Sequence, residues 1–216
     1  QYSKDIARGK WDGMMIQKHI GYKSWNDSFK ADIQPKVYRA ENVTNVFDED
    51  SKGYVAMEAE HYNSKTDGQG AQWTVIPDMG RTLSAVTLMP QTGDIKNASL
   101  TYKFIYKGKA EKAKVHIITK STLDYLNKGG LTYSIKMDGG DPIVVNFNSD
   151  MNEAPENIYD KYYPTIARRV IEKVVEMPVF ATSDSMHSLT FIPNDPGIVL
   201  EKVVVDFGGY KKQYLF

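Results

Sequence analysis

A two-residue period of apolar and polar side chains runs through the chain from Tyr54 onward, and no other feature limits the fold as strongly. In residues 100–107, every second side chain is large and apolar, at Leu100, Tyr102, Phe104 and Tyr106. Successive side chains of a β-strand point to opposite faces, so this alternation predicts strands with one buried face.

About ten such stretches follow one another, separated by turn-forming residues. We predict strands over residues 54–60, 73–77, 84–89, 100–107, 114–119, 131–137, 143–147, 174–180, 187–192 and 199–207. The sequence Asp138-Gly-Gly-Asp141 joins two of them as a hairpin, because glycine adopts the positive φ angles that tight turns need. Many short strands with regular turns indicate a mainly β fold, an antiparallel β-sandwich of the jelly-roll or galactose-binding-like type.

The N-terminal part of the chain has a different pattern. Its large apolar residues recur at a spacing compatible with a helical stripe, at Ile6, Trp11, Met14, Met15 and Ile20. We predict a helical lead-in over residues 1–30, a linker over residues 31–53 and a β-sandwich domain over residues 54–216. The lead-in has to bury its apolar groups, either on the sandwich or within a preceding helical domain. The chain begins at Gln1 without an initiator methionine, so we expect a processed or excised piece.

Composition excludes several classes of function. Lysine plus arginine equals aspartate plus glutamate at 27 each, so no overall charge attracts nucleic acid or an anionic membrane. The sequence has no cysteine, which excludes a disulfide, a thiol nucleophile and a zinc site with thiolate ligands. No run approaches the roughly 18 apolar residues of a membrane-spanning helix. We therefore expect neither a nucleic-acid partner nor a membrane partner.

One segment, residues 152–172, interrupts the rhythm of strands and reads as a loop followed by a helix. It concentrates Tyr159, Tyr162, Tyr163, Arg168 and Arg169 in a short span. Tyrosine rings stack on sugar faces, and an arginine pairs bidentately with a carboxylate, so these five are candidate carbohydrate contacts. The alternative is that the tyrosines only pin this segment to the sandwich.

Two further residues are candidate carbohydrate contacts. Trp73, with Tyr54 or Tyr62, would form a stacking platform if the domain binds sugar by itself. His19 is a candidate because it lies close in sequence to Tyr22 and Trp25.

Carboxylates near the first and last predicted strands suit a structural cation. Glu58 and Glu60 would lie on one strand face about 6.6 Å apart, from the rise per strand residue. Asp206 on the last strand is a third candidate ligand, and Asp195 is a weaker one. Oxygen ligands of this kind favour calcium, so a structural calcium ion is open and no other cofactor is expected. The alternative is that the two glutamates face solvent or form salt bridges.

No catalytic motif stands out. The four histidines are scattered, and the sequence has neither a Gly-x-Ser-x-Gly elbow nor a His-x-x-x-His pair. We therefore assign no catalytic residue to this chain.

Four stretches carry a resemblance to a known family. They are residues 53–62 (GYVAMEAEHY), 9–22 (GKWDGMMIQKHIGY), 73–87 (WTVIPDMGRTLSAVT) and 195–209 (DPGIVLEKVVVDFGG). The first resembles the opening strand of galactose-binding-like carbohydrate modules. Together, the four resemble the C-terminal part of glycoside hydrolase family 115, the xylan α-glucuronidases.

The resemblance implies a longer parent enzyme that removes glucuronic acid or its 4-O-methyl ether from glucuronoxylan. Its catalytic carboxylates belong to a barrel domain that is absent from this sequence. The chain would then be an ancillary domain that supports the active site or a homodimer, with a xylan-derived saccharide and the catalytic domain as partners. An independent carbohydrate-binding module and a purely structural or dimerisation domain are the alternatives. A periplasmic or secreted location follows from the resemblance alone.

Overall fold

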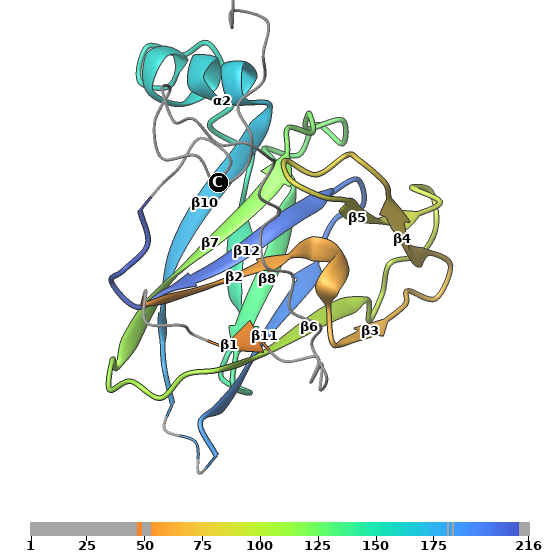
Figure 1. Cartoon of the computed structure of the whole chain (residues 1–216). Helices are drawn as coiled ribbons and strands as arrows, with labels where there is room; N and C mark the ends of the chain where they lie inside the picture. Colours follow the sequence, from red (N-terminus) through yellow and green to blue (C-terminus); the bar gives the residue numbers. More distant parts are fainter. Residues whose placement is uncertain (1–46, 49–52, 181, 183, 212–216) are drawn as a thin grey trace, which may run out of the picture. The chain divides into compact units, whose positions relative to one another are not determined.

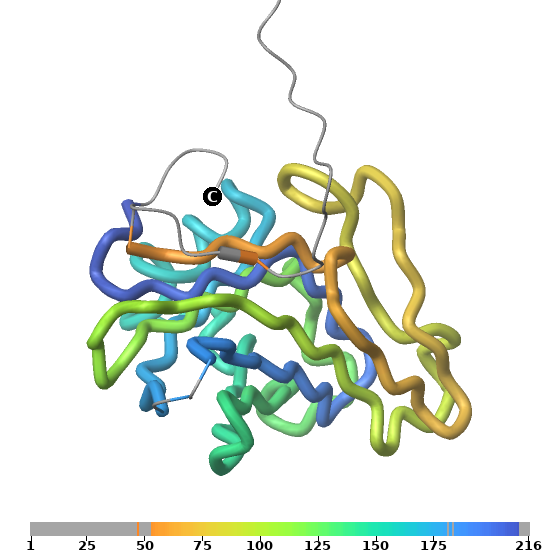
Figure 2. The backbone as a smooth tube through the Cα atoms, turned by 60° about the horizontal axis from the view of Figure 1, so that its bottom comes forward, coloured from red at the N-terminus to blue at the C-terminus, as the bar shows by residue number. Residues whose placement is uncertain are grey.

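The computed structural model describes residues 47–48, 53–180, 182 and 184–211. These residues form two six-stranded β-sheets. Figure 1 labels their strands, and Figure 2 shows the same backbone from another side. The mainly antiparallel sandwich that the alternating pattern predicts is therefore confirmed.

The first sheet has the strand order β1-β6-β11-β8-β9, and β3 also pairs with β6. Its members are β1 (Phe47–Asp48), β3 (Ser64–Thr66), β6 (Ser99–Ile105), β8 (Thr132–Met137), β9 (Ile143–Asn146) and β11 (Met186–Pro193). All pairings are antiparallel except that of β1 with β6. Strand β1 falls in the stretch expected to be linker, and Phe47 packs against the core.

The second sheet has the order β10-β7-β12-β5-β4, and β2 also pairs with β12. Its members are β2 (Tyr54–Glu58), β4 (Gln72–Ile76), β5 (Ala85–Met89), β7 (Lys112–Lys120), β10 (Val170–Pro178) and β12 (Leu200–Asp206). Strands β5 and β2 share one edge of β12, with β5 opposite Leu200 and β2 opposite Lys202–Asp206, and the pairing of β12 with β7 on the other edge has a register shift between Leu200 and Lys202.

The core lies between the sheets and consists of the apolar residues that the alternation places on one face. Tyr102 and Phe104 of β6, and Met57 of β2, have no exposed surface. Tyr102 buries its hydroxyl by donating a 2.7 Å hydrogen bond to the carbonyl oxygen of Ala59. Strand β2 ends at Glu58, and Ala59–His61 form the 3-10 turn η2, so the predicted strand 54–60 is too long by two residues.

The expected hairpin at residues 138–141 is present. Asp138 and Gly139 have φ values of 50° and 77°, and the Gly140 amide donates to the Met137 carbonyl at 2.9 Å. Both central residues of a type I′ turn need positive φ, and aspartate followed by glycine supplies it at little cost. The turn thus fixes the register of β8 against β9.

A helical insert precedes β10. It consists of the π-helix η3 (Ile158–Tyr162) and the α-helix α2 (Tyr163–Arg168), which ends at Arg169 in the left-handed region at φ 60°. Strand β10 begins directly afterwards at Val170, four residues earlier than the predicted strand. The predicted loop followed by a helix is confirmed, but the helix is short. No helix in the described residues is long and apolar enough to cross a bilayer.

Candidate functional site

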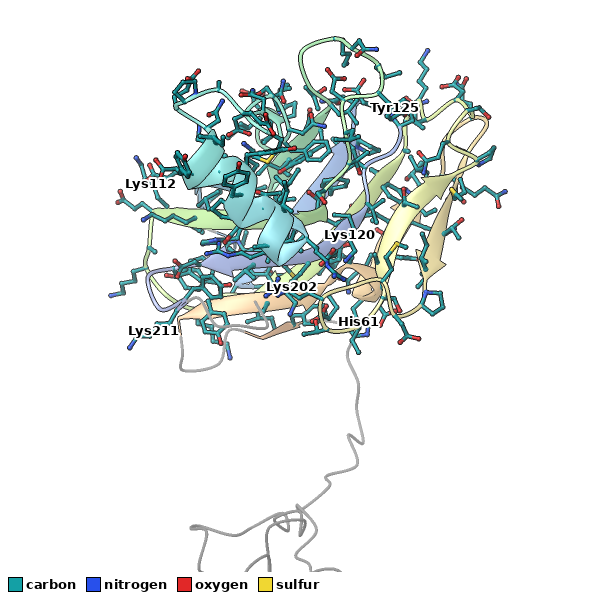
Figure 3. All side chains as sticks on the ribbon, turned by 90° about the horizontal axis from the view of Figure 1, so that it is seen from above. His61, Lys112, Lys120, Tyr125, Lys202 and Lys211 are labelled. Atoms are coloured by element: carbon teal, nitrogen blue, oxygen red, sulfur yellow. The ribbon has the colours of Figure 1, made fainter. Side chains whose placement is uncertain are left out.

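The helical insert and the first half of β10 enclose the cavity that we consider the candidate site. Its volume is about 260 Å³. The helices contribute Asp160, Lys161, Pro164, Thr165 and Arg168, and the sheet contributes Ile118, Glu172 and Lys173. In Figure 3 the insert crosses over the sheet, with Lys120 and Lys202 near one end of it.

The insert presents two different faces. The cavity-lining positions 160, 161, 164, 165 and 168 recur at helical spacing and therefore form one stripe. Tyr159, Tyr163 and Ile166 form another stripe and are 73%, 48% and 53% exposed. The two tyrosine rings meet edge to face, with centroids 5.8 Å apart.

The tyrosines and arginines that the sequence grouped together are therefore separated by the structure. None of the tyrosines in the described part of the chain lines the cavity, and Tyr162 is half-buried with its ring 5.9 Å from that of Tyr163. Arg168 lines the cavity, but Arg169 is the exposed residue that ends the helix and does not line it. A single site in which tyrosine rings and both guanidinium groups hold one sugar does not fit this arrangement.

Most of the charges around the cavity are already paired. Lys173 Nζ lies 2.9 and 2.8 Å from the two oxygens of Asp150, and Lys161 Nζ lies 3.4 Å from the same carboxylate. Burial acts to raise the pKa of Asp150, but the hydrogen bond and charge of Lys173 outweigh it and hold the pKa below its usual value. Glu172 Oε1 lies 2.9 Å from His116 Nδ1. Arg168 has no side-chain partner among the described residues, so its guanidinium is the available cation of the cavity.

A charged cluster that includes the buried Glu201 lies next to the C-terminal end of α2. Arg81 donates to the Arg168 carbonyl at 3.0 Å, which ties the β4–β5 loop to the insert. Lys120 Nζ lies 3.0 Å from Glu201 Oε1, and the Glu201 side chain is fully buried. Burial raises the pKa of Glu201, and the opposing effects of Lys120 and Arg81 do not cancel it.

The carboxylates expected to bind a cation do not converge. Glu58 accepts a 2.6 Å hydrogen bond from Thr82 and lies 2.8 Å from the Lys202 ammonium, whereas Glu60 lies beyond the strand, 3.7 Å from His61. Asp206 is opposite Tyr54, four positions along β12 from the Glu58 pairing, and accepts from the Gly208 and Tyr210 amides. In the described part of the chain, no group of three or more histidines and carboxylates is arranged to hold a metal ion. Glu58 therefore forms a salt bridge with Lys202, which is the alternative that the sequence left open for this carboxylate.

Asp195, the weaker candidate ligand, is also occupied. Its carboxylate accepts bonds from Lys128 at 2.6 Å and from the Thr132 amide and hydroxyl at 2.7 and 2.8 Å. These bonds anchor the loop before β12 to β8, and both carboxylate oxygens of Asp195 already have partners.

Trp73 is not placed as a stacking platform. Its side chain is 6% exposed, its indole Nε1 donates to the Thr66 carbonyl at 2.9 Å, and its ring centroid lies 6.4 Å from that of Phe191. Period-two alternation placed Trp73 on a strand correctly but did not decide which face is buried. Tyr54 and Tyr62 are both half-buried, and His19 lies outside the described residues.

Sequence reasoning missed another exposed apolar group, on the loop between β7 and β8. Leu123, Tyr125 and Leu126 are 80%, 49% and 42% exposed, and the Tyr125 hydroxyl donates to the Pro196 carbonyl at 3.0 Å. Figure 3 shows Tyr125 on a loop away from the insert. The sequence feature that could have revealed this group is the presence of three large apolar residues within four positions of one loop.

Comparison with known families gives one match: the model of the glycosyl hydrolase family 115 C-terminal domain covers residues 48–216. A comparison with curated protein sequences found no match.

Solved structures with a similar fold include an enzyme and two carbohydrate-binding modules. The enzyme is a family GH115 4-O-methyl-α-glucuronidase with specificity for decorated arabinogalactans (17% identity, TM-score 0.48, covering 70% of this chain and 18% of that chain). The modules are a family 35 module from Clostridium thermocellum (14% identity, TM-score 0.47, covering 70% of this chain and 97% of the module) and the C-terminal family 6 module of a laminarinase from Zobellia galactanivorans (13% identity, TM-score 0.43, covering 71% and 98%). The chain thus spans less than a fifth of the length of the enzyme.

Proposed function

The chain belongs to glycosyl hydrolase family 115 through its C-terminal domain, and on this premise we propose that it is the ancillary domain of an α-glucuronidase. The parent enzyme would remove glucuronic acid or its 4-O-methyl ether from glucuronoxylan. We propose that this chain supports the catalytic part of the parent and carries no catalysis itself. We propose a periplasmic or secreted location for the parent, because its substrate would be a polysaccharide.

The chemistry of the cavity supports a non-catalytic role. Glycoside hydrolysis needs a carboxylic acid whose raised pKa keeps it protonated until it donates to the leaving oxygen. Asp150 has a lowered pKa and two lysine partners, so it is a poor proton donor. Glu201 has a raised pKa, but its side chain is fully buried and does not line the cavity.

The exposed stripe of the insert is the observation that carries the proposal. Tyr159, Tyr163 and Ile166 are exposed on these short helices, and the rings of the two tyrosines contact each other. Tyrosine is favoured at protein interfaces because it buries a large ring while its hydroxyl stays hydrogen-bonded. The family assigns this domain to a longer chain, so we propose that the stripe packs on the remainder of the parent.

The test is made in the full-length parent enzyme. Tyr159→Ala combined with Tyr163→Ala is expected to lower kcat/KM on glucuronic-acid-substituted xylo-oligosaccharides and to uncouple the melting of this domain from that of the rest. The matched control is Leu123→Ala combined with Val144→Ala, which removes two exposed apolar side chains elsewhere on the sandwich. Unchanged kinetics and unchanged melting in the tyrosine variant would remove the proposed docking.

A second candidate function, sugar binding by the chain itself, is favoured by Arg168. This guanidinium lines the cavity and has no partner among the described residues, so it is free to form a bidentate pair with a uronate carboxylate. Isothermal titration of the 216-residue chain with substituted xylo-oligosaccharides tests it. Saturable heat supports an independent binding module, and the absence of heat from a folded chain argues against one.

A further inference from the structure

A second pocket lies at the other end of β10 from the insert. It has a volume of about 240 Å³ and is formed by the β6–β7 turn and the β10–β11 connection. The insert cavity includes Val170 at the start of β10, and this pocket includes Val179 just after its end. These two valines are nine positions apart along the strand, or roughly 30 Å at about 3.3 Å per residue.

The walls of this pocket are tied together by the backbone. The Tyr106 amide donates to the Ser185 carbonyl at 3.0 Å, and the Val179 amide donates to the Glu111 carbonyl at 2.9 Å. The Tyr106 ring stacks on Phe207 with centroids 3.6 Å apart, and its hydroxyl accepts from the Ala110 amide at 2.9 Å. Figure 2 shows both connections on the same side of the sandwich. The pocket is therefore shaped before any ligand arrives.

One wall of the pocket is His187, a buried and firmly oriented imidazole. The residue is 4% exposed, its ring stacks on Phe104 at 5.5 Å, and its Nδ1 lies 2.7 Å from Asp138 Oδ2. Asp138 also accepts from the Ser188 amide at 2.8 Å, which holds the carboxylate in place. A carboxylate that accepts from Nδ1–H fixes the tautomer and leaves Nε2 as the ring nitrogen for another group. Among the described residues, Nε2 has no hydrogen-bond partner.

The rim of the pocket combines positive charge with an aromatic face. Lys107 and Lys109 are exposed and have no ion-pair partner in the described residues, while Glu111 is the opposing charge on the same rim. Two lysines and one glutamate leave a net charge of +1 at the rim. The Phe180 ring is 45% exposed and rests against the hairpin, since a Cβ added at Gly140 would lie 3.0 Å from it.

We propose that this pocket binds a hexuronate residue of an acidic saccharide. The carboxylate pairs with Lys107 and Lys109, one ring hydroxyl donates to His187 Nε2, and an apolar face of the sugar covers Phe180. An inorganic anion would contact only the two lysines. A neutral sugar would contact only His187 and the Phe180 ring. The proposal concerns a different surface from the insert and does not depend on the role of Arg168.

The test is an NMR titration of the ¹⁵N-labelled 216-residue chain with sodium glucuronate, with glucose and inorganic phosphate in parallel. Glucuronate is expected to shift the Nε2 resonance of His187 saturably, with a much smaller effect on Nδ1. Lys107→Gln combined with Lys109→Gln should weaken this binding about fivefold or more. Lys96→Gln combined with Lys103→Gln removes two exposed charges elsewhere and should leave it unchanged.

Several outcomes would overturn the proposal. One is a His187 Nε2 resonance that does not move at saturating glucuronate, which rules out the pocket. If glucose shifts the resonance as much as glucuronate does, the pocket does not recognise the carboxylate. If phosphate shifts it as much, the pocket binds anions in general and not uronates in particular. If Arg168→Gln abolishes all glucuronate binding and the Lys107/Lys109 variant has no effect, the insert cavity is the uronate site instead.

Discussion

Glu58 and Lys202 face each other across β2 and β12 as a buried ion pair, with Oε1 of the glutamate 2.8 Å from Nζ of the lysine. Their side chains are 17% and 4% exposed. The ammonium stands where the sequence suggested a bound cation, and Thr82 donates a further hydrogen bond to the same glutamate oxygen. The pair thereby neutralises a carboxylate that the edge of the second sheet would otherwise leave buried and charged.

Replacing one partner of this pair should be costly. We expect Lys202→Met to lower the free energy of unfolding by about 3 kcal/mol, because Glu58 then stays buried without a counter-charge. The double variant Glu58→Leu/Lys202→Met should recover most of that loss, since no lone charge remains. Urea denaturation of the single and double variants measures both effects. If Lys202→Met unfolds at the wild-type urea concentration, the pair has no structural role.

The exposed pair between Lys112 and Glu176 provides the control. Its side chains are 69% and 54% exposed although its N–O distance is only 2.6 Å. Water screens such a pair, so Lys112→Gln should leave the denaturation midpoint unchanged.

Trp73 should contribute to stability and not to binding. Trp73→Ala is expected to cost about 3–5 kcal/mol, because it leaves a cavity next to Phe191. Trp73→Phe keeps part of the packing but leaves the Thr66 carbonyl without its donor, at a cost of about 1 kcal/mol. Circular dichroism during urea unfolding gives the stabilities, and titration with xylo-oligosaccharides should give the same affinity for Trp73→Phe as for the wild type. A loss of affinity in folded Trp73→Phe would restore the platform hypothesis.

The sequence was sufficient for the fold because a two-residue period leaves few alternatives once strands are short and numerous. It placed Leu100, Tyr102 and Phe104 correctly in the core, since all three have no exposed surface. The sequence did not predict that Trp73 is buried, because an aromatic ring can lie on either face of a strand at the edge of a sandwich. It also failed for Glu60, since a 3-10 turn beginning at Ala59 rotates that side chain away from the position that strand geometry would give it.

The sequence predicted the candidate site less well than the fold. The clustering of tyrosine and arginine in residues 159–169 located the insert correctly. Whether Tyr159 and Arg168 share a face, however, depends on where each helical turn lies, and the sequence did not specify the π-helical turn in η3. Lys107 and Lys109 of the β6–β7 turn lie 78 or more positions before His187, and the pairing of β6 with β11 brings them together.

Asp195 should make stability depend on pH at the acidic end. Burial acts to raise the pKa of Asp195, but bonds from Lys128 and Thr132 outweigh it and lower the pKa below its usual value. An acid whose pKa is lower in the folded state stabilises the fold above its unfolded pKa, and that contribution disappears as pH falls through the folded value. Asp195→Asn should therefore be less stable than the wild type at pH 7, and the difference should shrink below about pH 4.

Glu201→Gln is the internal control for this pH dependence, because the pKa of Glu201 is raised and the sign reverses. Ionised Glu201 costs folding free energy above its folded pKa, and that cost vanishes as pH falls below its unfolded value. The variant should gain stability relative to wild type at pH 7 and lose that advantage in acid. Parallel pH profiles for the Asp195 and Glu201 variants would contradict at least one of the two assignments.

Arg168 and Arg169 form an adjacent pair in which only one side chain lines the insert cavity. In the full-length parent, Arg168→Gln should raise KM for uronate-substituted xylo-oligosaccharides about tenfold, because a charged hydrogen bond contributes about 1.5–3 kcal/mol. Arg169→Gln changes the net charge equally and should leave KM unchanged, since Arg169 does not line the cavity. Steady-state kinetics on substituted and unsubstituted oligosaccharides separate the two variants. Equal effects of both would mean that net charge, and not a carboxylate contact at Arg168, governs substrate affinity.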